Sequence, residues 1–146
     1  MKHPSLSADS RLIQALEKRS LHVACSEGGF LFNQGDTPKG LFILERGKAA
    51  LVMRSDAGQP VMCLEAGSGS LLGLPGIIAN EPYTLTAIIR KGSVVSFISR
   101  EDFERTIQEE PVLYPSVLQM LAAEVRFARQ ALSEGYAAAE GLQRAD

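Results

Sequence analysis

The stretch GGFLFNQGDTPKGLFILERGKAALVM (residues 28–53) decides the fold that the sequence predicts. Short apolar runs, FLF at 30–32, GLFIL at 40–44 and KAALVM at 48–53, alternate with segments rich in Gly, Asn and Asp. Apolar runs of this length between turn-forming residues are typical of β-strands. The stretch therefore predicts consecutive strands joined by short turns.

The same pattern continues on the C-terminal side of this stretch. Further apolar runs are PVMCLE at 60–65, LTAII at 85–89 and SVVSFI at 93–98. Residues 55–58, Ser-Asp-Ala-Gly, have the composition of a hairpin turn. Closely spaced strands with turn signals between them predict a double-stranded β-helix (jelly-roll) over about residues 20–98.

Helices are expected on both sides of this β-roll. Leu12, Ile13 and Leu16 have helical spacing and predict a leading helix over about residues 7–19, with Ser7 or Ser10 as its N-cap. Ser99, followed three residues later by Asp102, resembles a capping box that opens the C-terminal helices (99–134). We expect one mainly β domain over residues 1–146, with flanking helices and a polar tail at 135–146.

The last helix, which we expect to begin near Pro115, carries apolar residues at spacings of three and four. They form a heptad seam: Leu118, Leu121, Val125, Ala128 and Leu132. In this register Glu124 can reach Arg129 of a parallel partner. Met120 and Phe127 point away from this seam and could pack on the barrel. The alternative is that the helix only lies on its own β-core. We favour a dimerisation helix, with a second copy or another protein as the partner.

Composition and charge exclude several classes of protein. The 146 residues are 45% hydrophobic and 22% charged, with a formal net charge of −2, so no overall positive field attracts nucleic acid. No apolar run is long enough to span a membrane, and we expect a cytoplasmic protein. Cys25 and Cys63 lack metal-site spacing, and we interpret them as small buried residues rather than a disulfide.

The sequence lacks a catalytic constellation. The strand region from 30 to 98 has no histidine, which argues against a metal-dependent barrel enzyme. His22 stands between Leu21 and Val23 and is interpreted as structural. Neither a P-loop nor a Gly-x-Gly-x-x-Gly motif occurs at a strand-to-helix junction. We expect neither an enzyme nor a bound metal or cofactor.

Residues 28–53 resemble the first half of a cyclic-nucleotide-binding domain. The resemblance lies in the Gln34-Gly35-Asp36 turn, the run at 40–44 and Gly47 at the end of that run. The order that follows also matches: hairpin, Gly-rich loop with a short helix, two strands, a capped helix and a long seam helix. About residues 10–134 resemble the sensor half of the cyclic-AMP receptor and fumarate–nitrate regulator family of bacterial transcription regulators.

This resemblance implies that residues 73–87, GLPGIIANEPYTLTA, correspond to the family's phosphate-binding cassette. The family pattern is Gly-Glu-Leu and, about ten residues later, Arg-Ser/Thr-Ala. Gly73 keeps the leading glycine, but Leu74 stands where the Glu belongs. Tyr83 takes the place of the Arg, and Thr84 that of the following hydroxyl residue. The positions that meet the base in the cyclic-AMP receptor fall near Ala128 and Arg129.

These departures lower the affinity expected for a cyclic nucleotide. An Arg–phosphate contact contributes on the order of 2–5 kcal/mol, and an unpaired ribose hydroxyl costs about 1–3 kcal/mol more. Three interpretations remain, and we rank the first highest. In the first, the pocket is filled by the side chains of Leu74, Ile77, Ile78 and Leu85. In the second, a different ligand is held by the amides of Gly76 and Ile77, in the short helix that Pro75 opens, and by the hydroxyls of Thr84 and Thr86. In the third, the loop contacts a protein.

Family members usually continue into a helix-turn-helix domain that reads DNA. The sequence given ends at Asp146, and Arg126, Arg129 and Arg144 are interspersed with acids. We therefore expect no specific DNA binding by this chain alone; a sensor-only relative and a shortened regulator both stay open. The expected function is regulatory: a dimeric, sensor-type domain with a degenerate cassette. The alternative is a sensor that still binds a cyclic nucleotide or another anion.

Overall fold

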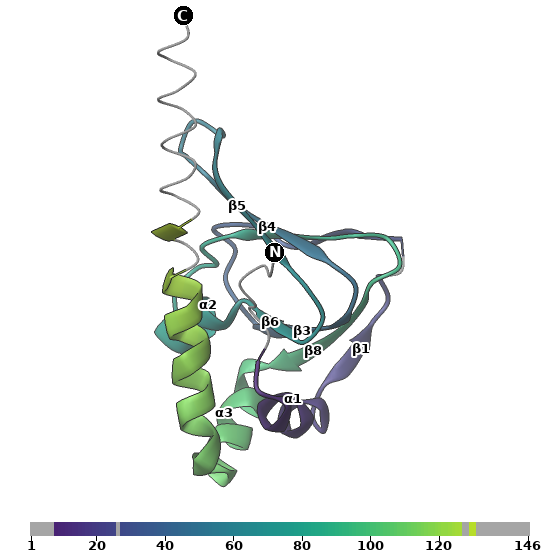
Figure 1. Cartoon of the computed structure of the whole chain (residues 1–146), viewed down its shortest axis with the longest axis vertical. Coiled ribbons are helices and arrows are strands. Elements are labelled where there is room, and N and C mark those ends of the chain that lie inside the picture. The colour runs from purple at the N-terminus through teal and green to yellow at the C-terminus, as the bar shows by residue number, and fades with distance from the viewer. Residues whose placement is uncertain (1–7, 26, 127–128, 131–146) are drawn as a thin grey trace, which may run out of the picture.

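The fold of the computed structural model, which describes residues 8–25, 27–126 and 129–130, is a β-roll flanked by helices (Figure 1). The strands of the described residues are β1 (Leu21–Val23), β2 (Gly29–Phe32), β3 (Gly40–Arg46), β4 (Ala49–Arg54), β5 (Pro60–Ala66), β6 (Ser70–Leu72), β7 (Thr86–Ile89) and β8 (Val94–Ser99). Three α-helices and one 3₁₀ turn are named as follows: α1 (Ser10–Glu17), α2 (Leu74–Ala79), α3 (Arg100–Glu109) and η1 (Pro111–Leu113). A further stretch, residues 114–126, is helical and is called the C-terminal helix below.

The strands form two four-stranded antiparallel sheets within the described part of the chain. One sheet has the order β1-β8-β3-β6 and the other the order β2-β7-β4-β5. Most neighbours are distant in sequence, as a jelly-roll requires, whereas β4 and β5 form a hairpin. Its turn is closed by a hydrogen bond from Gly58 N to Ser55 O of 2.9 Å. The predicted jelly-roll and the hairpin turn at 55–58 are both confirmed.

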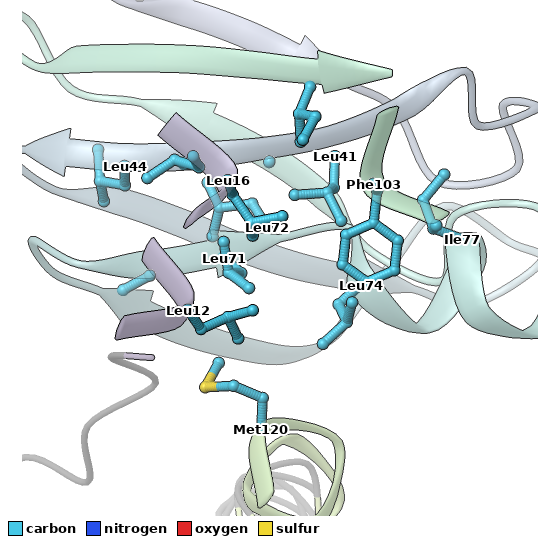
Figure 2. Packing of buried hydrophobic residues seen from close by; sticks show 14 of the residues in the cluster. Leu12, Leu16, Leu41, Leu44, Leu71, Leu72, Leu74, Ile77, Phe103 and Met120 are labelled. Carbon is cyan, nitrogen blue, oxygen red and sulfur yellow. The ribbon is translucent and has the colours of Figure 1, made fainter. Parts of the chain in front are cut away.

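The core lies between the two sheets and extends under the helices. Buried and exposed residues do not alternate along β3: Leu41, Ile43 and Leu44 are all fully buried. Both sides of this strand are covered, one by helices and the other by the second sheet. Figure 2 shows Leu12 and Leu16 of α1 and Phe103 of α3 in the same cluster as these strands. Met120 points from the C-terminal helix toward Leu12 (Figure 2), so the barrel-facing role expected for Met120 is confirmed.

Local capping explains where the helices begin. The Ser99 hydroxyl accepts a hydrogen bond from Asp102 N, which confirms the predicted start of α3. At α1 the N-cap is Asp9, whose carboxylate accepts from Arg11 N at 2.9 Å. Ser10 is the first helical residue, so its assignment as N-cap was wrong, and Ser7 lies outside the described residues. The C-terminal helix begins at residue 114, next to the predicted start at Pro115.

Side chains of the leading segment hold the C-terminal helices against the roll. Arg19 donates to the Thr106 hydroxyl at 2.9 Å and forms an ion pair with Glu109. The Ser116 hydroxyl donates to the Asp9 carboxylate at 3.0 Å. The Arg19 contacts hold α3, and the Asp9–Ser116 hydrogen bond holds the first turn of the C-terminal helix beside the start of α1.

The two cysteines occupy different environments. Both are free thiols; Cys25 is half-buried, whereas Cys63 on β5 is exposed. The expectation that both are buried was therefore wrong for Cys63, because residue 63 falls on the outward-facing side of β5.

Candidate functional site

The segment 73–87 begins with a sharp turn into a short helix. Gly73 has φ = 93°, a left-handed conformation that side chains other than glycine rarely adopt, and it is the N-cap of α2. Pro75 follows in the first turn, where its missing N–H costs no helical hydrogen bond. The helix ends at Asn80, also left-handed, whose amide oxygen accepts from Arg100 of α3. The sequence thus fixes both ends of α2.

Tyr83 is buried between the end of this segment and β2. Its ring stacks on Phe32, with ring centroids 3.9 Å apart and an angle of 21° between the ring planes. Its hydroxyl donates to the carbonyl oxygen of Gly40 at 2.6 Å. A Cβ atom at Gly73 would lie only 2.7 Å from Tyr83 Cε1, so glycine is needed there for space as well as for backbone geometry. Burial raises the pKa of the Tyr83 phenol above its usual value.

The backbone around Tyr83 is held by the turn that precedes β3. Gly35 N donates to Tyr83 O at 2.8 Å, and Tyr83 N donates to Asp36 O at 3.0 Å. Gln34 N donates to the hydroxyl of Thr86 at 2.9 Å. The Gln34-Gly35-Asp36 turn that carried the family resemblance therefore has a structural role, because it holds the loop before β7 on which Tyr83 stands.

The space left beside Tyr83 is small. A cavity of about 20 Å³, called the inner cavity, is lined by Phe32, Leu51, Leu71, Leu72, Gly73, Pro75, Gly76, Tyr83, Thr84, Leu85 and Glu124. A single water needs roughly 10–15 Å³ measured in this way. The inner cavity therefore has room for about one water molecule and none for a nucleotide.

A larger hollow lies on the other side of Thr84 and Leu85. This outer cavity has a volume of about 270 Å³ and is lined by Leu51, Met53, Met62, Leu64, Pro75, Thr84, Leu85, Leu121, Glu124 and Val125. Among these residues only Glu124 is ionisable. Desolvation by the surrounding protein raises the pKa of the Glu124 carboxyl from 4.5 to about 7. The outer cavity thus combines an apolar wall with one half-buried carboxyl group.

The predicted cassette residues divide into two groups. Gly73, Pro75, Gly76, Tyr83 and Thr84 line the inner cavity, whereas Leu74 and Ile77 belong to the hydrophobic core. Thr86 lies outside the linings of both cavities, and its hydroxyl is occupied by Gln34 N. Ile78, expected to help fill the pocket, is instead 48% exposed because it lies on the outer side of α2.

Sequence reasoning missed two contributors to the site. Phe32 is the stacking partner of Tyr83, but nothing in the sequence indicates that these distant positions meet. Glu124 was placed at the flank of a dimer seam, whereas the structure shows that its side chain lines both cavities. One feature of the sequence could have indicated this position of Glu124: an acidic residue stands next to Val125 and three positions from Leu121, on an apolar helix face.

The described part of the heptad seam is largely uncovered. Leu118 is 63% exposed and Val125 is 52% exposed, whereas Leu121 is half-buried against the core. Arg129 is exposed, and Ala128 and Leu132 lie outside the residues whose side chains are described. The pairing of Glu124 with a partner's arginine and the dimer itself stay predictions.

The described part of the chain contains neither a metal-ligand cluster nor a membrane-spanning helix. No group of three or more His, Cys, Asp or Glu side chains there is arranged to hold a metal ion. None of its helices combines the length and the hydropathy that crossing a membrane requires.

Comparison with known proteins identifies the architecture. The family model for the cyclic nucleotide-binding domain matches residues 22–110. A search of curated protein sequences finds no match. Among solved structures, the Thermus thermophilus catabolite activator protein superposes with a TM-score of 0.73 at 21% identity over 86% of this chain.

Two further structures show the same fold. The c-di-GMP-responsive global regulator CLP of Xanthomonas campestris gives a TM-score of 0.72 at 17% identity over 86% of this chain. The sensor domain of the transcriptional regulator DNR from Pseudomonas aeruginosa gives 0.64 at 19% identity, covering 80% of this chain and 79% of that one. This chain spans only 59% of the Thermus protein and 62% of CLP. At these identities the comparisons show the fold alone.

Proposed function

Because the chain belongs to the cyclic nucleotide-binding domain family, we propose that it is a regulatory, sensor-type domain rather than an enzyme and that it does not bind cyclic AMP or cyclic GMP tightly. The solved structures that it resembles include transcription regulators, which supports a cytoplasmic role in regulating transcription. This chain keeps the family's architecture, and the resemblance implies that it lacks the family's arginine and glutamate contacts to the ligand.

The observation that carries the proposal is the closed position of Tyr83. The ring stands where the family pattern has an arginine, and it is held by the stack on Phe32 and by the hydrogen bond to Gly40 O. Opening the inner cavity would break both contacts and expose a buried phenol. Leu74, at the place of the family's Glu, is fully buried in the core and cannot accept a hydrogen bond from a ribose.

Calorimetric titration with cyclic AMP and cyclic GMP, up to millimolar concentration, tests this part of the proposal. We expect no binding heat and no change in the melting temperature of the same sample. A dissociation constant below about 10 µM would contradict the proposal, since the lost arginine and glutamate contacts predict far weaker binding. If binding occurs and Thr84→Val weakens it, the alternative of a nucleotide held by backbone amides and threonine hydroxyls is favoured.

We also propose that the domain dimerises through the C-terminal helix. Two large apolar side chains of the seam, Leu118 and Val125, stand in solvent in the single chain. A further hollow of about 230 Å³ between α2, α3 and this helix is lined by Ile78, Tyr114, Leu118 and Leu121 among others. The apolar surface is thus continuous from the seam to α2, which is what a partner helix would cover.

The substitution Leu118→Asp tests the interface. In a dimer it would bury an unpaired charge, at a cost of several kcal/mol, so we expect a monomer by light scattering where the unchanged protein is a dimer. Val112→Asp is the matched control, because Val112 is 60% exposed, close to the 63% of Leu118, but lies on η1 outside the seam. A monomeric unchanged protein, or equal masses for all three proteins, would contradict the proposal.

A further inference from the structure

The outer cavity has a lining that does not suit an anion. Seven of its ten lining residues are Leu, Met or Val, and the only other groups are Pro75, Thr84 and Glu124. No lysine, arginine or histidine contributes to this lining among the described residues. A phosphate or carboxylate would therefore meet the Glu124 carboxyl with no positive charge to offset the repulsion.

The size of the cavity limits the ligand. An apolar cavity of about 150 Å³ in a protein interior holds one benzene molecule. The outer cavity, at about 270 Å³, has space for an aromatic ring together with a short side chain. It borders the low end of the range of roughly 300–1,000 Å³ that is usual for small-molecule sites.

Glu124 supplies the one strong polar contact that such a ligand could make. Glu124 lines the outer cavity as well as the inner one, and no ion pair to its carboxyl group is found among the described residues. A carboxylate in an apolar surrounding is costly unless a cation or a proton accompanies it. Desolvation also raises the pKa of this carboxyl to about 7, because the ionised form is disfavoured without a nearby cation.

We propose that the outer cavity, between β4, β5 and the C-terminal helix, binds a small apolar amine whose ammonium group pairs with Glu124 and whose hydrocarbon part packs on Leu64, Leu85 and their neighbours. The proposal deepens the proposed function, on which it rests, by naming the class of ligand that this sensor-type domain takes in place of a nucleotide. Binding would link β5 to the C-terminal helix, since Leu64 of β5 and Glu124 of that helix both line the cavity.

Calorimetry with 2-phenylethylamine as the probe tests the charge requirement. The titration is run at pH 8, where the Glu124 carboxyl is ionised and the amine is protonated. Two compounds of similar shape serve as controls: 2-phenylethanol, which is neutral, and 3-phenylpropanoate, which is an anion. We expect the amine to bind at least tenfold more tightly than the alcohol and the anion not to bind.

Variants place the binding in this cavity. Glu124→Gln keeps the shape but removes the charge, so we expect at least a tenfold loss for the amine and little change for the alcohol. Glu81→Gln is the matched control, since it makes the same chemical change at an exposed residue of segment 73–87 that lines neither cavity. Met53→Trp, which fills the outer cavity from β4, should abolish binding of both compounds; a melt of each variant verifies that it is folded.

Three results would overturn the inference: no binding of the amine at millimolar concentration, equal binding by Glu124→Gln, or tighter binding of the anion. Binding by the monomeric Leu118→Asp variant but not by the unchanged protein would also overturn it, because the second copy would then occupy the cavity or pair its Arg129 with Glu124. If the amine fails to bind, this inference is wrong but the proposed function still stands. If a cyclic nucleotide binds tightly, the proposed function is wrong, and that result comes from a separate titration without the amine.

Discussion

The resemblance places the family's arginine at position 83, where this chain has a tyrosine, and the two side chains have different requirements. A guanidinium at this place needs an anion, and without one it stays in water. A phenol ring is mostly apolar and needs only one hydrogen-bond partner when buried. The carbonyl oxygen of Gly40 supplies that partner, and Phe32 supplies the stacking surface. Tyr83 therefore belongs to the folded core of the ligand-free chain.

The substitution Tyr83→Phe measures the contribution of this hydroxyl. It removes the hydrogen bond to Gly40 O and leaves the stack on Phe32 in place. We expect a loss of about 1–3 kcal/mol in the free energy of unfolding, measured with urea, because a buried carbonyl loses its partner. Tyr114→Phe is the control, since Tyr114 is 49% exposed and should change stability by less than about 0.5 kcal/mol. Equal effects at the two positions would show that the buried hydroxyl is not stabilising.

Glu124 predicts a pH dependence of stability. Its folded-state pKa, about 7, is raised above the unfolded value of 4.5, so the native state binds the proton more tightly. The stabilising contribution of the protonated form is complete below about pH 4.5 and is lost as the pH rises to about 7. A shift of this size corresponds to a change on the order of 3–4 kcal/mol.

The comparison of unchanged protein with Glu124→Gln isolates this effect. Burial and the neighbouring Glu17 also raise the pKa of Glu45, so the pH profile of one protein alone would mix two groups. We expect Glu124→Gln to gain stability relative to the unchanged protein between pH 5 and pH 8, measured by urea unfolding. A difference between the two proteins that stays constant over this range would mean that the Glu124 carboxyl titrates normally.

At the scale of elements, the sequence predicts what depends on near neighbours. The hairpin of β4 and β5 follows from the Ser-Asp-Ala-Gly turn, and α3 begins at Ser99 because its hydroxyl reaches Asp102 N three residues away. The N-cap of α1 was wrong by one residue because Asp9 and Ser10 both have capping side chains. In the structure the Asp9 carboxylate caps the helix through Arg11 N and also accepts a hydrogen bond from Ser116, which is distant in sequence.

The candidate site could be predicted less well because it depends on pairs that are far apart in sequence. Leu74 and Ile77 were expected to fill the pocket and are buried, but Tyr83 closes it through Phe32 and Gly40. The heptad pattern predicts a helix with an apolar seam but does not specify how far that helix is rotated about its axis against the roll. The rotation of the helix about its axis determines which of its residues line the cavities, and in the structure Glu124 is one of them.

At the scale of the whole molecule, one helix serves two surfaces. Met120 and Val117 face the core of their own chain, and Leu118 and Val125 face solvent. Glu124 lies between these faces, beside the outer cavity. A ligand in that cavity and a partner on the seam would therefore act on the same turns of the helix, which gives the fold a physical route from binding to assembly.

If the seam forms a dimer, the thermal stability of the protein must depend on its concentration. Association stabilises the folded state by mass action, so a hundredfold rise in concentration adds roughly 2–3 kcal/mol per dimer, which raises the melting temperature by several degrees. Leu118→Asp should melt at a temperature that is lower and independent of concentration, whereas Val112→Asp should follow the unchanged protein. Calorimetric melts over this range of concentrations measure all three. A melting temperature of the unchanged protein that does not vary would mean that the exposed Leu118 and Val125 are covered by a different partner or by none.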